Sequence, residues 1–190
     1  MIRITSGRLK GKKLLSMDQD IEIRPTLSKT RAAIFNSIQS RWNIHDFSVY
    51  DLFAGTGTLG IEAYSRGAKH VVFVDKDKKS FAFLKKNLNY LDIAKDCDLF
   101  CADALNWIKI HHWTAEPKLL LLDPPYNSPV LQEIIDFLAT GEIPLSDSVV
   151  VIERSVKTSI NFPDGLQPFR QKTFGLTQLD FLEFEKSNYN

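Results

Sequence analysis

A glycine-rich turn follows the apolar residues 49–53. Its glycines, Gly55, Gly57 and Gly60, have the spacing GxGxxG, and Asp75 ends the next apolar run. Glycines at a strand-to-helix turn let a ligand approach the backbone closely, and an acid that ends the second strand can accept hydrogen bonds from both hydroxyls of a ribose. The pattern therefore predicts a site for a ribose-bearing cofactor, either the dinucleotide of a dehydrogenase or another nucleoside.

The sequence Asp123-Pro124-Pro125-Tyr126 follows a run of leucines. Two consecutive prolines fix a stiff backbone, and ligands of open α/β sheets bind at the carboxyl ends of the strands, so we expect this motif beside the glycine-rich turn. Asp123 and the Pro124 carbonyl can accept the two N–H bonds of an exocyclic amine, while Tyr126 stacks on its ring. These acceptors would aim the lone pair of the amine at an electrophilic methyl group, a reaction that depends on alignment and desolvation. The motif thus predicts methyl transfer to a planar amine, with no metal site.

Asp103, which follows the third apolar run, has two interpretations. Its carboxylate can accept a hydrogen bond from the amino group of an adenine, or it can cap the helix predicted over residues 103–111. One carboxylate could do both.

Short apolar runs alternate with segments of helical spacing over residues 49–152. Because the strands are apolar on both sides, the pattern predicts a parallel sheet with helices on both faces. Residues 169–174 and 179–185 predict an antiparallel pair of strands, joined through Gly175, at one edge of the sheet. The other expected strands are 49–53, 70–74, 98–101, 118–122 and 149–152, and the expected helices are 58–66, 78–91, 103–111 and 130–138.

Charge is segregated along the chain. The net charge is +1, but residues 1–45 hold nine basic and three acidic residues, a balance of +6, and the remainder has a balance of −5. Such asymmetry can mark a contact with nucleic acid or a membrane surface. We therefore expect a basic extension over residues 1–45 and a main domain over residues 46–190.

The extension has its own predicted elements. Residues 2–5 and 9–14 predict a hairpin, and a helix is expected after Pro25, with Thr26 or Ser28 as its N-cap. The apolar stripe of this helix is Ile34, Phe35, Ile38 and Trp42.

Arg31 begins this stripe, and two interpretations remain open for it. Its stem can pack while the guanidinium snorkels to solvent, or the guanidinium can point into a cleft at an anion.

The composition excludes several classes of protein. No apolar run approaches the roughly 18 residues that cross a bilayer, and we expect no secretory signal because the first residues lack an apolar core. The two cysteines, Cys97 and Cys101, are expected to be buried thiols of a cytoplasmic protein.

Several segments together resemble the bacterial small-subunit ribosomal RNA guanine-N2 methyltransferases of the RsmD type. The resemblance covers nearly the whole chain, in the segments RITSGRLKGKKL, RPTLSKTRAAIFN, DLFAGTGTLGIEAYSRGA, FVDKD and LDPPY. The last two are shared by many methyltransferases, whereas the first two are more specific.

The resemblance implies a Rossmann-like class I methyltransferase with a seven-stranded, mostly parallel sheet and S-adenosylmethionine as its cofactor. The implied substrate is a guanine of 16S ribosomal RNA, within a small ribosomal subunit or an assembly intermediate. Because nothing in the sequence suggests an obligate dimer, we also expect a monomer. The motif from Asp123 to Tyr126 would hold the guanine. The implied cofactor-binding residues are Asp51, Phe53, Ala54, Gly55, Thr56, Gly57, Asp75, Lys76, Asp103 and Ala104. The implied RNA-binding residues are Arg3, Arg8, Lys10, Lys12, Lys13, Arg24, Lys29 and Arg31.

Three other interpretations remain. The same acceptor motif would serve adenine N6 in DNA or a protein glutamine amide. An NAD-dependent dehydrogenase fits the glycine-rich turn and Asp75 but leaves the Asp123 motif and the basic extension without a role. The third interpretation is an RNA-binding protein without enzymatic activity, but it gives the glycine-rich turn no role.

Overall fold

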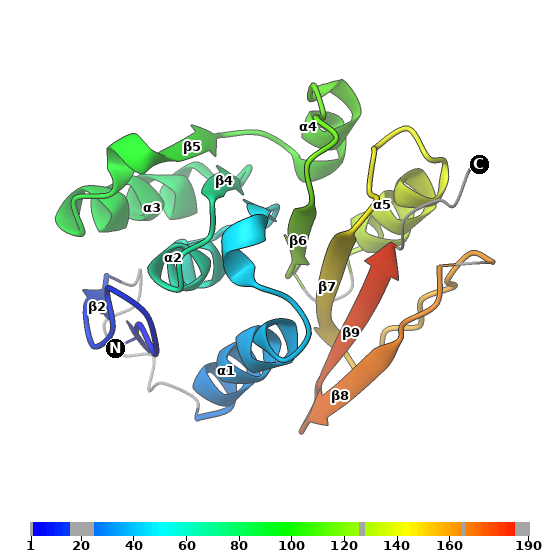
Figure 1. Ribbon diagram of the computed structural model, residues 1–190, viewed down its shortest axis with the longest axis horizontal. Coiled ribbons are helices and arrows are strands. Elements are labelled where there is room, and N and C mark those ends of the chain that lie inside the picture. Colours follow the sequence, from blue (N-terminus) through cyan, green and yellow to red (C-terminus); the bar gives the residue numbers. More distant parts are fainter. Residues whose placement is uncertain (1, 16–24, 126–127, 165, 185–190) are drawn as a thin grey trace.

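The computed structural model describes residues 2–15, 25–125, 128–164 and 166–184, and Figure 1 shows their arrangement. The described residues form one seven-stranded sheet and a separate two-stranded hairpin. The strands of the large sheet are β3 (Ser48–Asp51), β4 (His70–Val74), β5 (Cys97–Phe100), β6 (Lys118–Leu122), β7 (Ser148–Ser155), β8 (Arg170–Phe174) and β9 (Thr177–Phe184).

The strand order in the sheet is β5-β4-β3-β6-β7-β9-β8. Strands β3 to β7 are parallel, and β9 pairs antiparallel with both β7 and β8. The chain reverses between β8 and β9 at Gly175, whose φ of +61° lies in the left-handed region that favours glycine. The predicted fold class is confirmed, including the antiparallel pair at the edge, although β9 begins earlier than expected.

Helices cover both faces of the sheet, as Figure 1 shows. On one face, α1 (Pro25–Gln39), α2 (Thr58–Ser65) and α3 (Lys78–Tyr90) pack on strand residues such as Val49 and Phe73. On the other, α4 (Ala104–Ile110) and α5 (Val130–Ala139) pack on Val72, Leu120 and their neighbours. Two short 3-10 helices, Ile44–Asp46 and Ala94–Asp96, complete the elements. Burial on both faces explains why the inner strands β4, β6 and β7 are mostly apolar, whereas the edge strands β5 and β8 alternate in exposure.

The predicted hairpin is shorter than its sequence pattern. Its strands, β1 (Ile2–Arg3) and β2 (Lys13–Leu14), pair over two residues each, and the chain between them runs through turns. Gly7 has a φ of +78°, and a Cβ atom there would lie 1.8 Å from the carbonyl oxygen of Ser65 on α2. The turns therefore follow the surface of α2, which prevents a longer ladder.

Helix α1 differs from its prediction at both ends. It begins at Pro25, so Thr26 and Ser28 lie inside its first turn and the predicted N-cap is wrong. Proline is favoured at the first helical position, because the N–H it lacks would have no partner there. The helix ends at Gln39, so Trp42 lies beyond it, where its ring packs against Phe169. The buried side chains of α1 nevertheless belong to the same hydrophobic core as β3, β4 and β6.

Candidate active site

The candidate site lies where the strand order reverses. From β3 the chain continues to β4 on one side of the sheet, whereas β6 lies on the other side of β3 and continues to β7. Ligands of open α/β sheets bind outside the carboxyl ends of the strands at such a point. The glycine-rich turn, Asp75 and Asp123 leave the sheet at this edge. The structure thus brings the two predicted halves of the site together.

The three glycines of the turn have different roles. Gly57 is the N-cap of α2 with a φ of +89°, and a Cβ atom on Gly60 would lie 2.2 Å from the ring of Phe73. Gly60 therefore permits the close packing of α2 on the sheet, and Gly57 permits that of the turn on Leu84 of α3. At Gly55, by contrast, no atom lies within 4 Å of the point that a Cβ atom would occupy, so open space adjoins its backbone. A ligand can approach the turn there.

Two carboxylates hold the turn in place. Asp75 accepts hydrogen bonds from the backbone N–H of Gly55, at 2.6 Å, and from that of Asp77, at 2.7 Å. Asp51 accepts one from the backbone N–H of Gly60 at 2.8 Å. A carboxylate has about four acceptor positions, so Asp75 retains the capacity to bind ribose hydroxyls.

Asp51 also carries an unsatisfied oxygen. Its residue is buried, and Oδ1 has no hydrogen-bond partner among the described residues. Burial raises its pKa to about 7, the Gly60 N–H opposes that rise, and the charges of Asp123 and Asp75 add to it. A buried polar atom without a partner needs an explanation. A cationic or hydrogen-bond-donating ligand at this edge would supply one.

Asp103 caps helix α4, and that interpretation of it is confirmed. Its Oδ1 accepts a hydrogen bond from the backbone N–H of Asn106 at 3.3 Å, and its Oδ2 lies 3.4 Å from Nζ of Lys76. Ala104, the first residue of α4, and Ala54 are buried, whereas Phe53 and Thr56 are half-buried.

Asn87 on α3 is a residue that the sequence analysis missed. Its fully buried amide donates hydrogen bonds to the carbonyls of Thr56, at 2.8 Å, and Leu15, at 3.1 Å, and accepts one from the Leu15 N–H at 2.7 Å. It therefore ties the glycine-rich turn to the end of the basic hairpin. The sequence does indicate this residue, because Asn87 is a polar residue on the apolar stripe that Leu84 and Leu88 define.

Asp123 and Pro124 lie at the end of β6. Asp123 keeps access to solvent at the sheet edge, but the protein around its carboxyl removes enough water to raise its pKa to about 6. Pro124 is buried and Pro125 is exposed. Tyr126 lies outside the described residues.

Glu153 on β7 was also missed. Strands β6 and β7 pair Leu122 with Ile152, so Glu153 follows in register beside Asp123. Its side chain is buried, and burial together with the charge of Asp123 raises its pKa to about 8. The signal in the sequence was an acid at the end of an apolar strand.

The basic extension presents most of its predicted RNA-binding side chains to solvent. Arg8 stacks its guanidinium over the ring of Tyr64 at 3.7 Å, and Arg3 donates a hydrogen bond to the carbonyl of Gly11. Arg24 lies outside the described residues. The exposed basic residues are Arg3, Arg8, Lys10, Lys12, Lys13 and Lys29.

Arg31 does not belong with them, and this corrects the prediction. Its side chain is 4% exposed, its Nη2 donates a hydrogen bond to the carbonyl of Arg3 at 2.6 Å, and its Nε lies 3.3 Å from Glu62. The guanidinium therefore neither snorkels to solvent nor enters an open cleft. It joins α1 to the hairpin and to α2.

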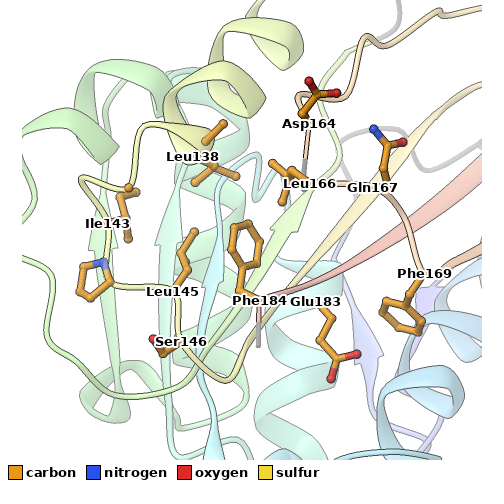
Figure 2. Close-up of a pocket in the computed structure, with 13 residues that line it drawn as sticks. Leu138, Ile143, Leu145, Ser146, Asp164, Leu166, Gln167, Phe169, Glu183 and Phe184 are labelled. Atoms are coloured by element: carbon orange, nitrogen blue, oxygen red, sulfur yellow. The ribbon is translucent and has the colours of Figure 1, made fainter. Parts of the chain in front are cut away.

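A cavity of about 660 Å³ lies at the opposite edge of the sheet, before the start of β7 (Figure 2). Side chains of Leu138, Ile143, Leu145 and Phe184 gather around it, with Asp164 and Glu183 as its acids. None of the described residues that were predicted to bind the cofactor, the base or the RNA lines this cavity. The candidate site is therefore the edge described above and not this cavity.

Other predictions concern cysteines, metals and membranes. Cys97 is buried, but Cys101 lies past the end of β5 and is exposed, which corrects the expectation for that residue. Within the described ranges, no group of side chains has the composition of a metal site. No helix in that part of the chain is long and apolar enough to span a membrane.

The chain is similar to known proteins over nearly its whole length. Residues 2–183 match the family model described as "Conserved hypothetical protein 95". The chain is 32% identical to "Ribosomal RNA small subunit methyltransferase D" of Buchnera aphidicola, with 90% of this chain and 87% of the relative covered. It is 28% identical to the protein of that name in Escherichia coli, with coverage of 92% and 85%.

Solved structures share the fold. A structure from Escherichia coli, described as a candidate methyltransferase, yhhF, has a TM-score of 0.81 and 26% identity, and covers 98% of this chain and 99% of its own. An RNA methyltransferase from Salinibacter ruber in complex with S-adenosyl-L-homocysteine has a TM-score of 0.57 and 15% identity, with coverage of 84% and 95%. The latter likeness concerns the fold alone.

Proposed function

The chain belongs to the RsmD family of ribosomal RNA methyltransferases, and from that premise we propose that it transfers a methyl group from S-adenosylmethionine to the exocyclic N2 of a guanine in 16S ribosomal RNA. The relatives named above support methylation of small-subunit ribosomal RNA, and the resemblance of the sequence supports S-adenosylmethionine and guanine N2, with guanine 966 in nucleotide numbering as the target. The observation that carries the proposal is the unpaired, buried Oδ1 of Asp51 beside Asp75 and Asp123.

The residues of this edge fit S-adenosylmethionine. That cofactor carries an ammonium group and a sulfonium group, and three carboxylates around the strand reversal favour cations there. Asp51 would accept a hydrogen bond from the ammonium group, Asp75 would bind the ribose, and the backbone beside Gly55 would face the ligand. Asp103 and Lys76 would lie near the adenine. When bound, the cofactor supplies an electrophilic methyl group on sulfur.

Asp123 and the Pro124 carbonyl would hold the acceptor. An exocyclic amine is a weak nucleophile because its lone pair is delocalised into the ring, so two acceptors on its N–H bonds help to direct that lone pair toward the methyl group. Methyl transfer would join this nitrogen to the methyl carbon while the carbon–sulfur bond breaks, and the nitrogen would then have a proton to lose. The Asp123 carboxylate, which reaches solvent and has a pKa raised to about 6, would receive this proton and release it to solvent.

The basic extension would contact the phosphates of the RNA. Its exposed charges lie on the hairpin and on α1. Glu62 on α2 and Asn87 on α3 hold the hairpin beside the glycine-rich turn. We propose this role for residues 1–45 and the catalytic role for residues 46–190, although both parts share one hydrophobic core.

A labelling experiment tests the proposal. The protein is incubated with S-adenosylmethionine carrying a labelled methyl group and, separately, with small ribosomal subunits from a strain that lacks this protein, with DNA, and with protein. Mass mapping of the RNA should place the label on N2 of one guanosine. Label confined to DNA or to protein, or tight binding of NAD without binding of S-adenosylmethionine, would overturn it.

A further inference from the structure

Glu153 lies next to the proposed base-binding residues. Alternation along β6 and β7 places Leu121 and Val151 in the core beneath α1 to α3, and Leu122 and Ile152 in the core beneath α4 and α5. One residue further, Asp123 and Glu153 follow in register on the first of these faces. Glu153 also lines a small cavity together with Pro124 and Pro125. The methyl-transfer steps described above leave it without a role.

Glu153 lacks the partners that other buried charges have. Its side chain is 8% exposed, and no described residue donates a hydrogen bond to it. Lys118, which is fully buried, donates to the carbonyls of Thr114, Glu116 and Pro144. Asp180 accepts from Arg154, Gln171 and Gln178. A largely enclosed carboxyl that lines a cavity beside the proposed substrate site, and that has no donor among the described residues, indicates that a ligand supplies its partner.

We propose that Glu153 is a specificity-determining residue, which accepts a hydrogen bond from the ring N–H that lies next to the methylated amine of guanine. The inference rests on the proposed function. Guanine presents N1–H directly beside its amine, whereas the ring nitrogen beside the amine of adenine or of cytosine carries no hydrogen. Asp123, the Pro124 carbonyl and Glu153 together provide three acceptors for three adjacent N–H bonds.

The protonation of Glu153 is compatible with this contact. The charge of Asp123 favours the protonated form of its neighbour, and a protonated carboxyl still offers one carbonyl oxygen as an acceptor. Its O–H can in addition donate to O6 of guanine. The contact therefore does not require two adjacent carboxylates to be charged together.

The test uses 2-aminopurine, which keeps the 2-amino group but lacks N1–H and O6. Two synthetic RNA fragments carry either guanine or 2-aminopurine at the nucleotide that mass mapping identifies. We measure kcat and KM for methyl transfer to each fragment. The wild-type protein should prefer guanine by about tenfold or more in kcat/KM, the size of one bidentate contact to a base edge.

Three variants separate the explanations. Glu153→Leu removes the acceptor and should reduce the preference to within about threefold, mostly through kcat, with unchanged affinity for S-adenosylmethionine. Glu153→Gln keeps a carbonyl acceptor of the same shape and should retain the preference. Glu133→Leu, at an exposed glutamate on α5, should change neither quantity.

The outcomes are distinct. A preference for guanine that survives Glu153→Leu overturns the assignment of Glu153 and leaves the proposed function intact. Equal losses of thermal stability in Glu153→Leu and Glu153→Gln would show a structural role and also overturn it. If Glu153→Leu alone fails to fold, Glu153→Ala, which cannot overpack the site, gives the same comparison. Wild-type protein that methylates no guanosine overturns both proposals.

Discussion

Two buried glutamates in this molecule have opposite surroundings. Glu62 on α2 is 1% exposed and accepts hydrogen bonds from Thr5, Ser6 and Arg66, with Arg31 as a further ion-pair partner. Glu153 on β7 is almost as enclosed, yet the described residues give it no donor. Burial of a charge costs free energy that hydrogen bonds normally offset. Glu62, with its donors in place, holds the scaffold together, whereas Glu153, which lines a cavity without a donor among the described residues, marks a place for a ligand.

The largest effect on activity should come from Asp123→Ala, since Asp123 lies beside Glu153 at the proposed substrate site. Losing the charged acceptor should lower kcat for RNA methylation by about 100-fold or more, since preorganised polar groups in active sites have effects of this size. The melting temperature should not fall, because Asp123 is exposed and its pKa is raised. Near-normal turnover in this variant would remove the catalytic assignment.

Glu62→Ala should have the opposite profile. Without the carboxylate, Arg31 and Arg66 remain buried and unpaired, so the free energy of unfolding should fall by about 3–5 kcal/mol. Urea denaturation measures this loss. Glu183→Ala, which breaks the more exposed pair with Arg41, is the matched control and should change stability by less than about 1 kcal/mol. If both variants lose the same free energy of unfolding, the buried ion pairs of Glu62 contribute no more to stability than the surface pair of Glu183.

The pH dependence of stability sharpens the contrast. The usual pKa of a glutamate is 4.5, and that of Glu153 is raised to about 8. Between these values the folded state binds more protons than the unfolded state, so the contribution of Glu153 to stability falls as pH rises through this window. Glu153→Gln removes this loss and should be more stable than the wild type by about 2–4 kcal/mol at pH 8.

Denaturation at pH 5 provides the control for Glu153→Gln, because its difference from the wild type in free energy of unfolding should nearly vanish at that pH. A variant that is less stable than the wild type at both pH values would place Glu153 with Glu62 as a scaffold residue.

Activity should depend on pH through Asp123. The Asp123 carboxylate must be ionised to take the proton that the methylated amine loses, and its pKa is raised to about 6. The rate should therefore fall as pH falls through this value, approaching about tenfold per pH unit below it. Single-turnover rates between pH 5 and 8, with RNA and cofactor saturating, measure this dependence. A flat profile over that range would contradict it.

The smallest effects should come from the exposed hairpin. Replacing Lys10 and Lys12 by Ala should weaken RNA binding by a few-fold and reduce the slope of log affinity against log salt by about 1 for each phosphate that is no longer neutralised. Filter binding over a salt series measures both quantities. Lys157→Ala, at an exposed site on the main domain, should leave the slope unchanged. An unchanged slope in the hairpin variants would make those lysines an ordinary solvated surface.

Some features could be predicted from the sequence because they depend on local chemistry. The glycine-rich turn, Asp75 and the prolines after β6 indicate strands that end in ligand-facing loops, and parallel topology then brings such loops to one edge. The turns around Gly7 and the role of Arg31 depend instead on what the chain meets in space. The turns rest on Ser65 and Arg31 pairs with Glu62, so both are decided by α2, an element distant in the chain.

Asn87 and Glu153 were not predicted for the same reason. Each is a polar residue at a position that the periodicity assigns to the core, and their neighbours come from other elements. Only the register of β6 with β7 places Glu153 beside Asp123, and only the packing of α3 brings Asn87 to Thr56.

The amide of Asn87 has a consequence for how freely the chain can vary. It binds both the N–H and the carbonyl of Leu15, as a neighbouring strand would, so the backbone is held while the side chain is 43% exposed. Position 15 can therefore accept many residue types, and position 87 very few. A cysteine at position 15 could carry a fluorescent probe that reports, from a fixed point, on events at both the hairpin and the glycine-rich turn.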